Sequence, residues 1–145
     1  MAIHFILVLN RQGKTRLAKW FDNNYTTQDK QRYTTEIHRL ISSRDLKYQS
    51  NFIEYQQNKL VYRRYAGLYF ISSIDLIDSE LDSLESLHFL VEVLDVYFDN
   101  VCELDLIFNF YKLYSILDEI FLGGEFQEIL KDKILERLAY LDKLD

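Results

Sequence analysis

Residues 52–75 have the sequence FIEYQQNKLVYRRYAGLYFISSID, and this segment is the most informative about the fold. Aromatic and β-branched residues, which favour strands, fill three segments of it: 52–55, 60–65 and 68–74. The segments are separated by Gln56–Asn58 and by Ala66-Gly67, where the glycine permits a tight bend. Parallel strands need a long crossover connection, so gaps this short predict an antiparallel meander.

Two more strands are predicted before the meander. Ala2–Leu9 is an almost unbroken apolar run, which is typical of a central strand covered on both faces. Asn10 and Gly13 favour a hairpin turn. The turn leads into a second strand over Lys14–Phe21, and its three basic residues suit the edge of a sheet, where charge discourages pairing with other chains.

Four helices are predicted. The first lies between the two groups of strands, with Thr26 or Thr27 as its N-cap and its end near Ser42–Ser43. The polar segment Arg44–Ser50 then connects it to the meander. After Asp75 the apolar period changes from two to about three and a half residues, which predicts the other three.

The three later helices are predicted from apolar stripes. The first stripe, capped by Asp78 or Ser79 and interrupted at Asp99-Asn100, is Leu81, Leu84, Leu87, Val91, Leu94 and Phe98. The second, ended by Gly123-Gly124, is Leu104, Ile107, Phe108, Tyr111, Tyr114 and Leu117. The third is Ile129, Leu130, Ile134, Leu138 and Leu141. This order of elements predicts a single α+β domain over residues 1–145, with helices packed on an antiparallel sheet.

Composition excludes several classes of protein. A chain of 145 residues that is 48% hydrophobic and 28% charged is too apolar to be disordered. Eleven Tyr and ten Phe favour packed cores and protein interfaces. The single cysteine, Cys102, excludes an internal disulfide framework, and with no signal peptide in view we expect a reducing, cytoplasmic compartment. No apolar run reaches the roughly 18 residues that a membrane-spanning helix needs.

Charge is distributed unevenly along the chain. Residues 1–66 carry 12 Lys and Arg against 5 Asp and Glu, whereas residues 67–145 carry 5 against 18. Both halves are too apolar to be charged tails, so the asymmetry lies within one fold. A basic face would suit an anionic lipid, a nucleic acid or an acidic peptide, and an acidic face a basic partner. The simpler interpretation is that each half is solvated by its own mixture of charges.

Catalytic and nucleotide-binding motifs are absent from the sequence. Gly13-Lys14-Thr15 lacks the upstream glycine of a phosphate-binding loop. The three histidines fall on different predicted elements, so no metal or cofactor is expected. We expect His4 to be a satisfied core residue and Cys102 an inert buried thiol. Arg63 and Arg64 between tyrosines could stack bases, but the acidic load of the chain argues against nucleic acid.

Long strings of residues resemble the small (sigma) subunits of clathrin adaptor complexes. They are Phe5–Trp20, Tyr62–Phe70 (YRRYAGLYF) and Asn100–Phe110 (NVCELDLIFNF). The match continues at nearly constant spacing to about Gly124. Ala66-Gly67 and Tyr111-Lys112 are more similar to the endocytic, plasma-membrane adaptor than to its Golgi sibling.

This resemblance implies a fold, a role and partners. The fold is longin-like (SNARE-like): a five-stranded antiparallel sheet flanked by helices on both faces. The role is that of a non-catalytic core subunit in a heterotetramer with two large subunits and one medium subunit. Such complexes act in endocytosis, peripherally at plasma-membrane clathrin-coated pits, and bind acidic dileucine sorting signals on the tails of transmembrane cargo.

The resemblance also implies which residues bind the dileucine signal. Arg16 matches the basic residue that meets the acidic side chain of the signal. The pocket for the two leucines matches Tyr65, Ala66, Leu68, Val91, Asn100, Val101, Leu104 and Leu106. Without the resemblance, core packing is the favoured interpretation of each apolar residue, and Arg16 would be an ordinary charge on an edge strand.

Two other functions remain open from the sequence. A longin-type subunit of another coat, tether or SNARE-linked assembly, such as a Golgi or endosomal adaptor, would share the fold but lack Arg16 beside an apolar pocket. A small metal-free enzyme would instead place a titratable residue with a strongly shifted pKa inside a pocket.

Overall fold

The computed structural model describes residues 3–22, 24–44, 51–122, 125–126 and 131–144. Its elements are β1 (Ile3–Leu9), β2 (Thr15–Trp20), α1 (Thr27–Ser42), β3 (Phe52–Tyr55), β4 (Asn58–Tyr65), β5 (Leu68–Asp75), α2 (Glu80–Tyr97), α3 (Glu103–Phe108), α4 (Phe110–Ile120), β6 (Phe121–Leu122), β7 (Glu125–Phe126) and α5 (Lys131–Leu144). The predicted α+β class is confirmed. The predicted helix stop at residues 123 and 124, and residues 129 and 130 of the last stripe, lie outside the described residues.

The sheet is five-stranded and antiparallel throughout, in the order β2-β1-β5-β4-β3. The predicted meander is confirmed, since β3 pairs with β4 and β4 with β5. β1 lies between β2 and β5, which explains its nearly continuous apolar sequence, and β2 is an edge strand as predicted. The pairing of β1 with β5 shifts register between Ile3 and Phe5, which leaves His4 as an extra residue in the strand.

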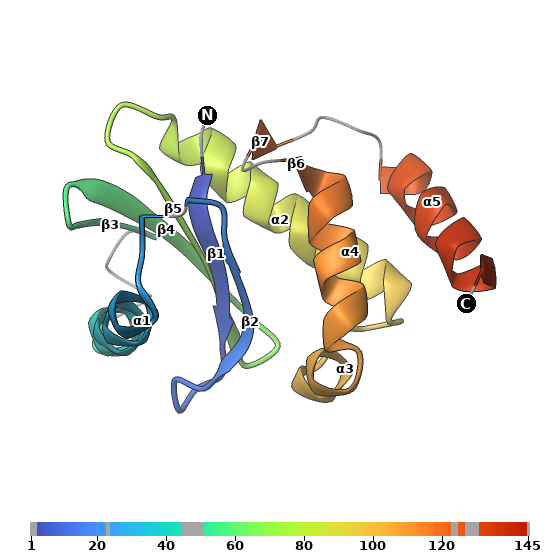
Figure 1. Cartoon of the computed structure of the whole chain (residues 1–145), viewed down its shortest axis with the longest axis horizontal. Helices are drawn as coiled ribbons and strands as arrows, with labels where there is room; N and C mark the ends of the chain where they lie inside the picture. Colours follow the sequence, from blue (N-terminus) through green and yellow to red (C-terminus); the bar gives the residue numbers. More distant parts are fainter. Residues whose placement is uncertain (1–2, 23, 45–50, 123–124, 127–130, 145) are drawn as a thin grey trace.

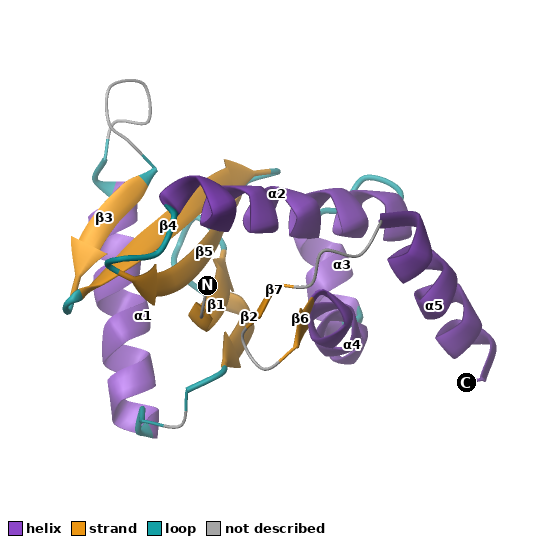
Figure 2. Cartoon of the chain, turned by 90° about the horizontal axis from the view of Figure 1, so that it is seen from above, coloured by secondary structure: helices purple, strands orange, loops and turns teal. Residues whose placement is uncertain are grey.

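Helices cover both faces of the sheet (Figures 1 and 2). On one face, Ile37 and Ile41 of α1 pack against the alternate residues Phe5, Leu7 and Leu9 of β1. The N-terminus of α1 is fixed by a capping box, in which Thr26 and Asp29 each accept a hydrogen bond from the other's backbone N–H. The predicted start and end of this helix are confirmed.

The second face carries the larger core, formed by α2, α4 and α5 over β1, β4 and β5. The predicted stripe of α2 is partly wrong, because Leu81 is exposed while Leu90 and Val93 are buried. Ser83 and Ser86 of α2 are also fully buried. The hydroxyl of Ser83 lies 3.0 Å from that of Ser72 on β5, so the two polar groups satisfy each other inside the core.

The predicted helix from Leu104 to Leu117 is in fact two helices. α3 ends at Phe108 and α4 begins at Phe110, because Asn109 departs from helical geometry with φ −124° and ψ 32°. The break turns the two stripes apart. The residues that are consequently exposed are Leu104, Ile107, Phe108 and Tyr111. The buried residues of this region are Leu106, Leu113, Ile116, Leu117 and Ile120.

Candidate functional site

The nine predicted site residues come from elements that meet at one end of the sheet. Arg16 lies on β2, Tyr65 ends β4, Val91 lies on α2 and the segment 100–106 runs into α3. Figure 1 shows α3 at the same end of the molecule as the β1–β2 and β4–β5 turns. Residues that are distant in sequence are thus gathered in one region by the fold.

Four of the predicted residues belong to the core of the second face. Leu68, Val91, Val101 and Leu106 are each at most 3% exposed. Side chains that are already covered by their own chain can form the floor of a binding site, but they do not form its open surface.

The other apolar and amide residues lie at or near the surface. Leu104 is 59% exposed, Ala66 and Asn100 are exposed, and Tyr65 is half-buried. Ala66 and Asn100 have left-handed backbone angles, with φ of 53° and 72°, as tight turns require. The region therefore presents one large apolar side chain and one amide beside a half-buried tyrosine.

Asp95 of α2 ties this region together and was not identified from the sequence. Its carboxylate accepts hydrogen bonds from the hydroxyl of Tyr65 and, at 3.0 Å, from the backbone N–H of Val101. Its backbone carbonyl accepts a further bond of 2.8 Å from the N–H of Asn100. The bond to the carboxylate raises the pKa of the Tyr65 phenol, which stays protonated and donates. No motif marks Asp95, because its partners come from two other elements.

Arg16 is already paired with a carboxylate of its own chain. Its Nε donates to Oε1 of Glu103, the first residue of α3, at 2.8 Å. The Nδ2 of Asn10 donates to the same oxygen at 2.9 Å. These hydrogen bonds, first from Arg16 and then from Asn10, hold the pKa of Glu103 below its ordinary value. Glu103 was also missed from the sequence, where it is one acid among many.

Asn10 connects this ion pair to the β1–β2 turn. Its side-chain oxygen accepts hydrogen bonds from the backbone N–H groups of Gln12 and Lys14, at 3.0 and 2.8 Å. The turn is thereby closed by the same side chain that holds Glu103. The turn residue Gly13 has φ of 87°, and an added Cβ would lie 2.8 Å from the ring of His38, so glycine is required there.

The prediction for Cys102 is wrong, and that for His4 is only partly right. Cys102 is exposed, because it is the N-cap residue of α3 and lies in the turn before it rather than in the core. The side chain of His4 is 20% exposed, and its Nε2 lies 2.6 Å from a carboxylate oxygen of Asp75. His4 is therefore satisfied as expected, but at the edge of the core.

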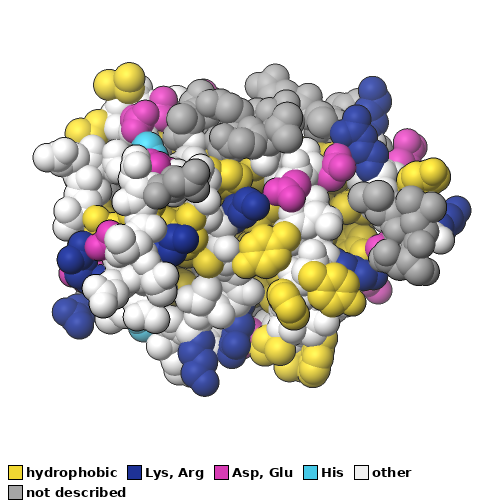
Figure 3. Space-filling model, in the orientation of Figure 1, with side chains coloured by type: hydrophobic (Ala, Val, Ile, Leu, Met, Phe, Trp, Pro, Cys, Tyr) yellow, Lys and Arg dark blue, Asp and Glu magenta, His cyan; other side chains and the backbone are white. Residues whose placement is uncertain are grey.

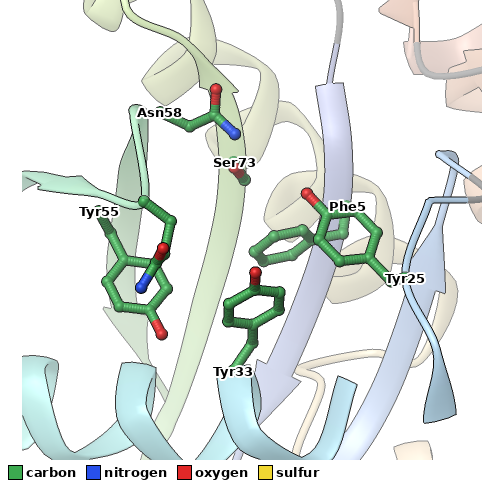
Figure 4. A pocket seen from close by; sticks show the side chains of 7 residues that line it. Phe5, Tyr25, Tyr33, Tyr55, Asn58 and Ser73 are labelled. Carbon is green, nitrogen blue, oxygen red and sulfur yellow. The ribbon is translucent and has the colours of Figure 1, made fainter. Parts of the chain in front are cut away.

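An aromatic pocket lies on the opposite face, between α1 and the sheet (Figure 4). It contains none of the nine predicted residues; it is lined by Phe5, Tyr25, Tyr33, Tyr55, Gln56, Asn58 and Ser73. The rings of Tyr25 and Tyr33 pack edge to face at 5.5 Å, and those of Tyr33 and Tyr55 at 5.8 Å. Rings in this arrangement fix α1 on the sheet.

One residue of this pocket bears on the enzyme hypothesis. Burial, together with the hydrogen bond to Glu36, raises the pKa of Tyr55. A raised pKa makes the phenol still harder to ionise near neutral pH, so Tyr55 remains a hydrogen-bond donor and is not poised as a base or nucleophile. Its shift therefore indicates packing rather than catalysis.

The described part of the chain has neither a cluster of metal ligands nor a helix that could cross a membrane. Its His, Cys, Asp and Glu side chains nowhere gather in groups of three that could hold a metal ion. Of the helices described here, none is both long enough and apolar enough to span a bilayer.

The chain is similar over almost its whole length to small subunits of adaptor complexes. The family model of the clathrin adaptor complex small chain matches residues 2–145. The AP-2 complex subunit sigma of Gibberella zeae is 58% identical over 143 residues, covering 99% of each chain. That of Dictyostelium discoideum is 54% identical over 142 residues, covering 98% of this chain and 99% of the relative.

A second Dictyostelium relative and one structure extend the comparison. The AP-1 complex subunit sigma-2 of the same organism is 49% identical over 144 residues, covering 99% of this chain and 92% of the relative. Among structures, a chain of a homology model of the full-length AP-3 complex in a stretched open conformation superposes with a TM-score of 0.76 at 31% identity. That superposition covers 98% of this chain and 94% of the other.

Proposed function

The chain belongs to the clathrin adaptor complex small-chain family, and we propose that it is the small subunit of an AP-2 type, endocytic adaptor complex. The match over residues 2–145 carries the proposal. The type of complex is supported by two relatives from one organism, since the AP-2 subunit of Dictyostelium is 54% identical and its AP-1 counterpart 49%. A place in a Golgi or endosomal adaptor is the alternative.

The proposed role is assembly and cargo binding rather than catalysis. The partners would be two large subunits and one medium subunit, and the complex would sit peripherally at plasma-membrane clathrin-coated pits. The whole chain, residues 1–145, would act as one longin-like domain. No cofactor is required, because binding and packing alone perform this role.

Assembly is supported by an apolar ridge on α3 and α4. Four of its side chains are between 39% and 72% exposed: Ile107, Phe108, Phe110 and Tyr111. Figure 3 shows large apolar side chains gathered over these helices. Contiguous apolar surface of this kind on a small protein marks an interaction site. We assign the ridge to a large subunit.

Cargo binding is supported by the region around Arg16. Two adjacent leucines would pack on the surface formed by Ala66, Asn100 and Leu104, above the buried floor that contains Val91. Burying two Leu side chains contributes roughly 3–6 kcal/mol before the costs of association. The Asn100 amide can pair with the peptide backbone, and Arg16 can meet the acidic residue of the signal.

A double-mutant cycle on the assembled complex tests this function. Arg16→Ala should weaken binding of an acidic dileucine peptide by about 0.5–1.5 kcal/mol, or roughly 2- to 12-fold, because a partly exposed ion pair contributes little beside the leucines. Changing the acidic residue of the peptide to Ala should then cost much less in the Arg16→Ala complex than in wild type. Calorimetric titration measures all four affinities. Fully additive losses would show that Arg16 does not meet the acid.

A further inference from the structure

The guanidinium of Arg16 has room for a second carboxylate. Glu103 accepts from Nε alone, and the arginine has four further N–H groups on its two terminal nitrogens. Within the described residues, these four groups have no protein acceptor. The side chain of Arg16 is 23% exposed and that of Glu103 is 37% exposed, so both reach solvent. A ligand acid can therefore bind Arg16 while Glu103 stays in place.

Glu103 is held independently of Arg16. Asn10 donates to the same carboxylate oxygen and is itself 5% exposed. Its own oxygen is fixed by two backbone N–H groups of the β1–β2 turn. The Glu103 carboxylate is therefore held in position, and a ligand acid that binds Arg16 would lie close to its negative charge.

We propose that Glu103 is a specificity-determining residue that limits how strongly Arg16 favours an acidic residue in the sorting signal. This inference rests on the dileucine function proposed above. Glu103 partly neutralises the arginine and repels a second carboxylate on the same guanidinium. Like charges a few ångströms apart oppose each other even near the surface, although salt screens them. The resident acid thus keeps the preference for acidic signals small, and neutral residues at that position remain acceptable.

The test compares two dileucine peptides, one with the acid and one with Ala in its place, on the assembled adaptor complex. The measured quantity is the ratio of their two affinities. Glu103→Gln keeps an oxygen that can accept from Arg16 and Asn10 but removes the charge. The ratio in favour of the acidic peptide should rise roughly two- to fivefold over wild type. Glu103→Ala serves as a second variant and should move the ratio in the same direction.

Asp118→Asn is the matched control. Asp118 pairs at 3.6 Å with Lys19, which lies on the same strand as Arg16, so this change also removes one acid beside one β2 cation. It should leave the ratio unchanged. Combining Glu103→Gln with Arg16→Ala should bring the ratio close to one, because the cation that discriminates is gone.

The outcomes separate this inference from the function beneath it. A ratio that stays at the wild-type value or falls in both Glu103 variants, while the wild-type complex binds both peptides, overturns the role of Glu103 alone. An equal rise in the Asp118→Asn complex also overturns it, because a general change of charge would then be the cause. Failure of the wild-type complex to bind either peptide overturns the dileucine function and this inference together.

Discussion

At the scale of single residues, burial separates the predicted site into two groups. Val91, Leu68, Val101 and Leu106 lie in the core, whereas Leu104 lies in solvent. The sequence shows that all five residues are apolar. Whether each side chain faces its own chain or a ligand depends on packing. Substitutions at the floor of the site must therefore be compared with a core control on the same element.

Val91 and Leu87 form such a pair, since they are four residues apart on one face of α2 and are 3% and 0% exposed. Val91→Asp should abolish dileucine binding, because it places a charge in the floor on which a leucine must pack. Tyrosine-based signals, bound by the medium subunit, should still bind. Leu87→Asp should prevent assembly, because its charge would be buried beneath the helix.

Peptide binding and size-exclusion chromatography of the two complexes check this prediction. If Val91→Asp also fails to assemble, or loses both kinds of signal, Val91 is a core residue only.

At the scale of elements, the site depends on how α2, β4 and the α2–α3 connection are fastened together. Asp95 bonds to Tyr65 at the end of β4 and to Val101 in the connection. Asp99 and Asn100 in that connection have left-handed φ angles of 54° and 72°, which are uncommon for residues other than glycine. The bonds to Asp95 help to hold this strained turn.

Asp95→Ala should therefore destabilise the complex. The N–H of Val101 would lose its acceptor, and an unsatisfied polar group of this kind costs about 1–3 kcal/mol. Thermal unfolding followed by circular dichroism measures the effect. Glu85→Ala, which removes an exposed acid from the same helix, is the control and should change the midpoint little. Equal midpoints for the two variants would mean that the Asp95 bonds do not stabilise the turn.

At the scale of the whole molecule, the uneven charge of the sequence becomes pairing between the two halves. Basic residues of the first half meet acids of the second in the pairs Arg16–Glu103, Lys19–Asp118 and Lys59–Glu80. The simpler interpretation, that each half is solvated by its own charges, is incomplete. Each exposed pair contributes little to stability, but the two pairs from β2 join the basic edge strand to α3 and α4.

The apolar ridge also belongs to this scale, because we propose that a large subunit covers it. The isolated chain should aggregate, and co-expression with a large subunit should make it soluble.

Phe108→Gln, at a residue 72% exposed on the ridge, should lower recovery of the large subunit in co-purification. Ile77→Gln is the control, because Ile77 is 94% exposed but lies in the β5–α2 connection. A monodisperse isolated chain at high concentration, or equal recovery from both variants, would contradict an interface on this ridge.

Local sequence was sufficient for the strands, the first helix and its cap. Side chains along a strand alternate between its two faces, and tight turns need particular residues. Alternating residues joined by short gaps therefore specify an antiparallel meander. Thr26 was identifiable as a cap because its hydrogen bond closes within one turn of helix. The resemblance added Arg16 and the apolar set, which the fold brings to one end of the sheet.

Tertiary structure alone decided the break at Asn109, the exposure of Cys102 and the partners of Arg16. The same apolar spacing in the sequence is compatible with one long helix or with two short ones. The break at Asn109 and the exposure of the ridge therefore depend on how α3 and α4 pack. Glu103 and Asp95 have no signature in the sequence, because their hydrogen bonds join elements that are far apart along the chain. Such contacts follow from the energy of the whole packed molecule, whereas local pattern reports only on neighbours within a few residues.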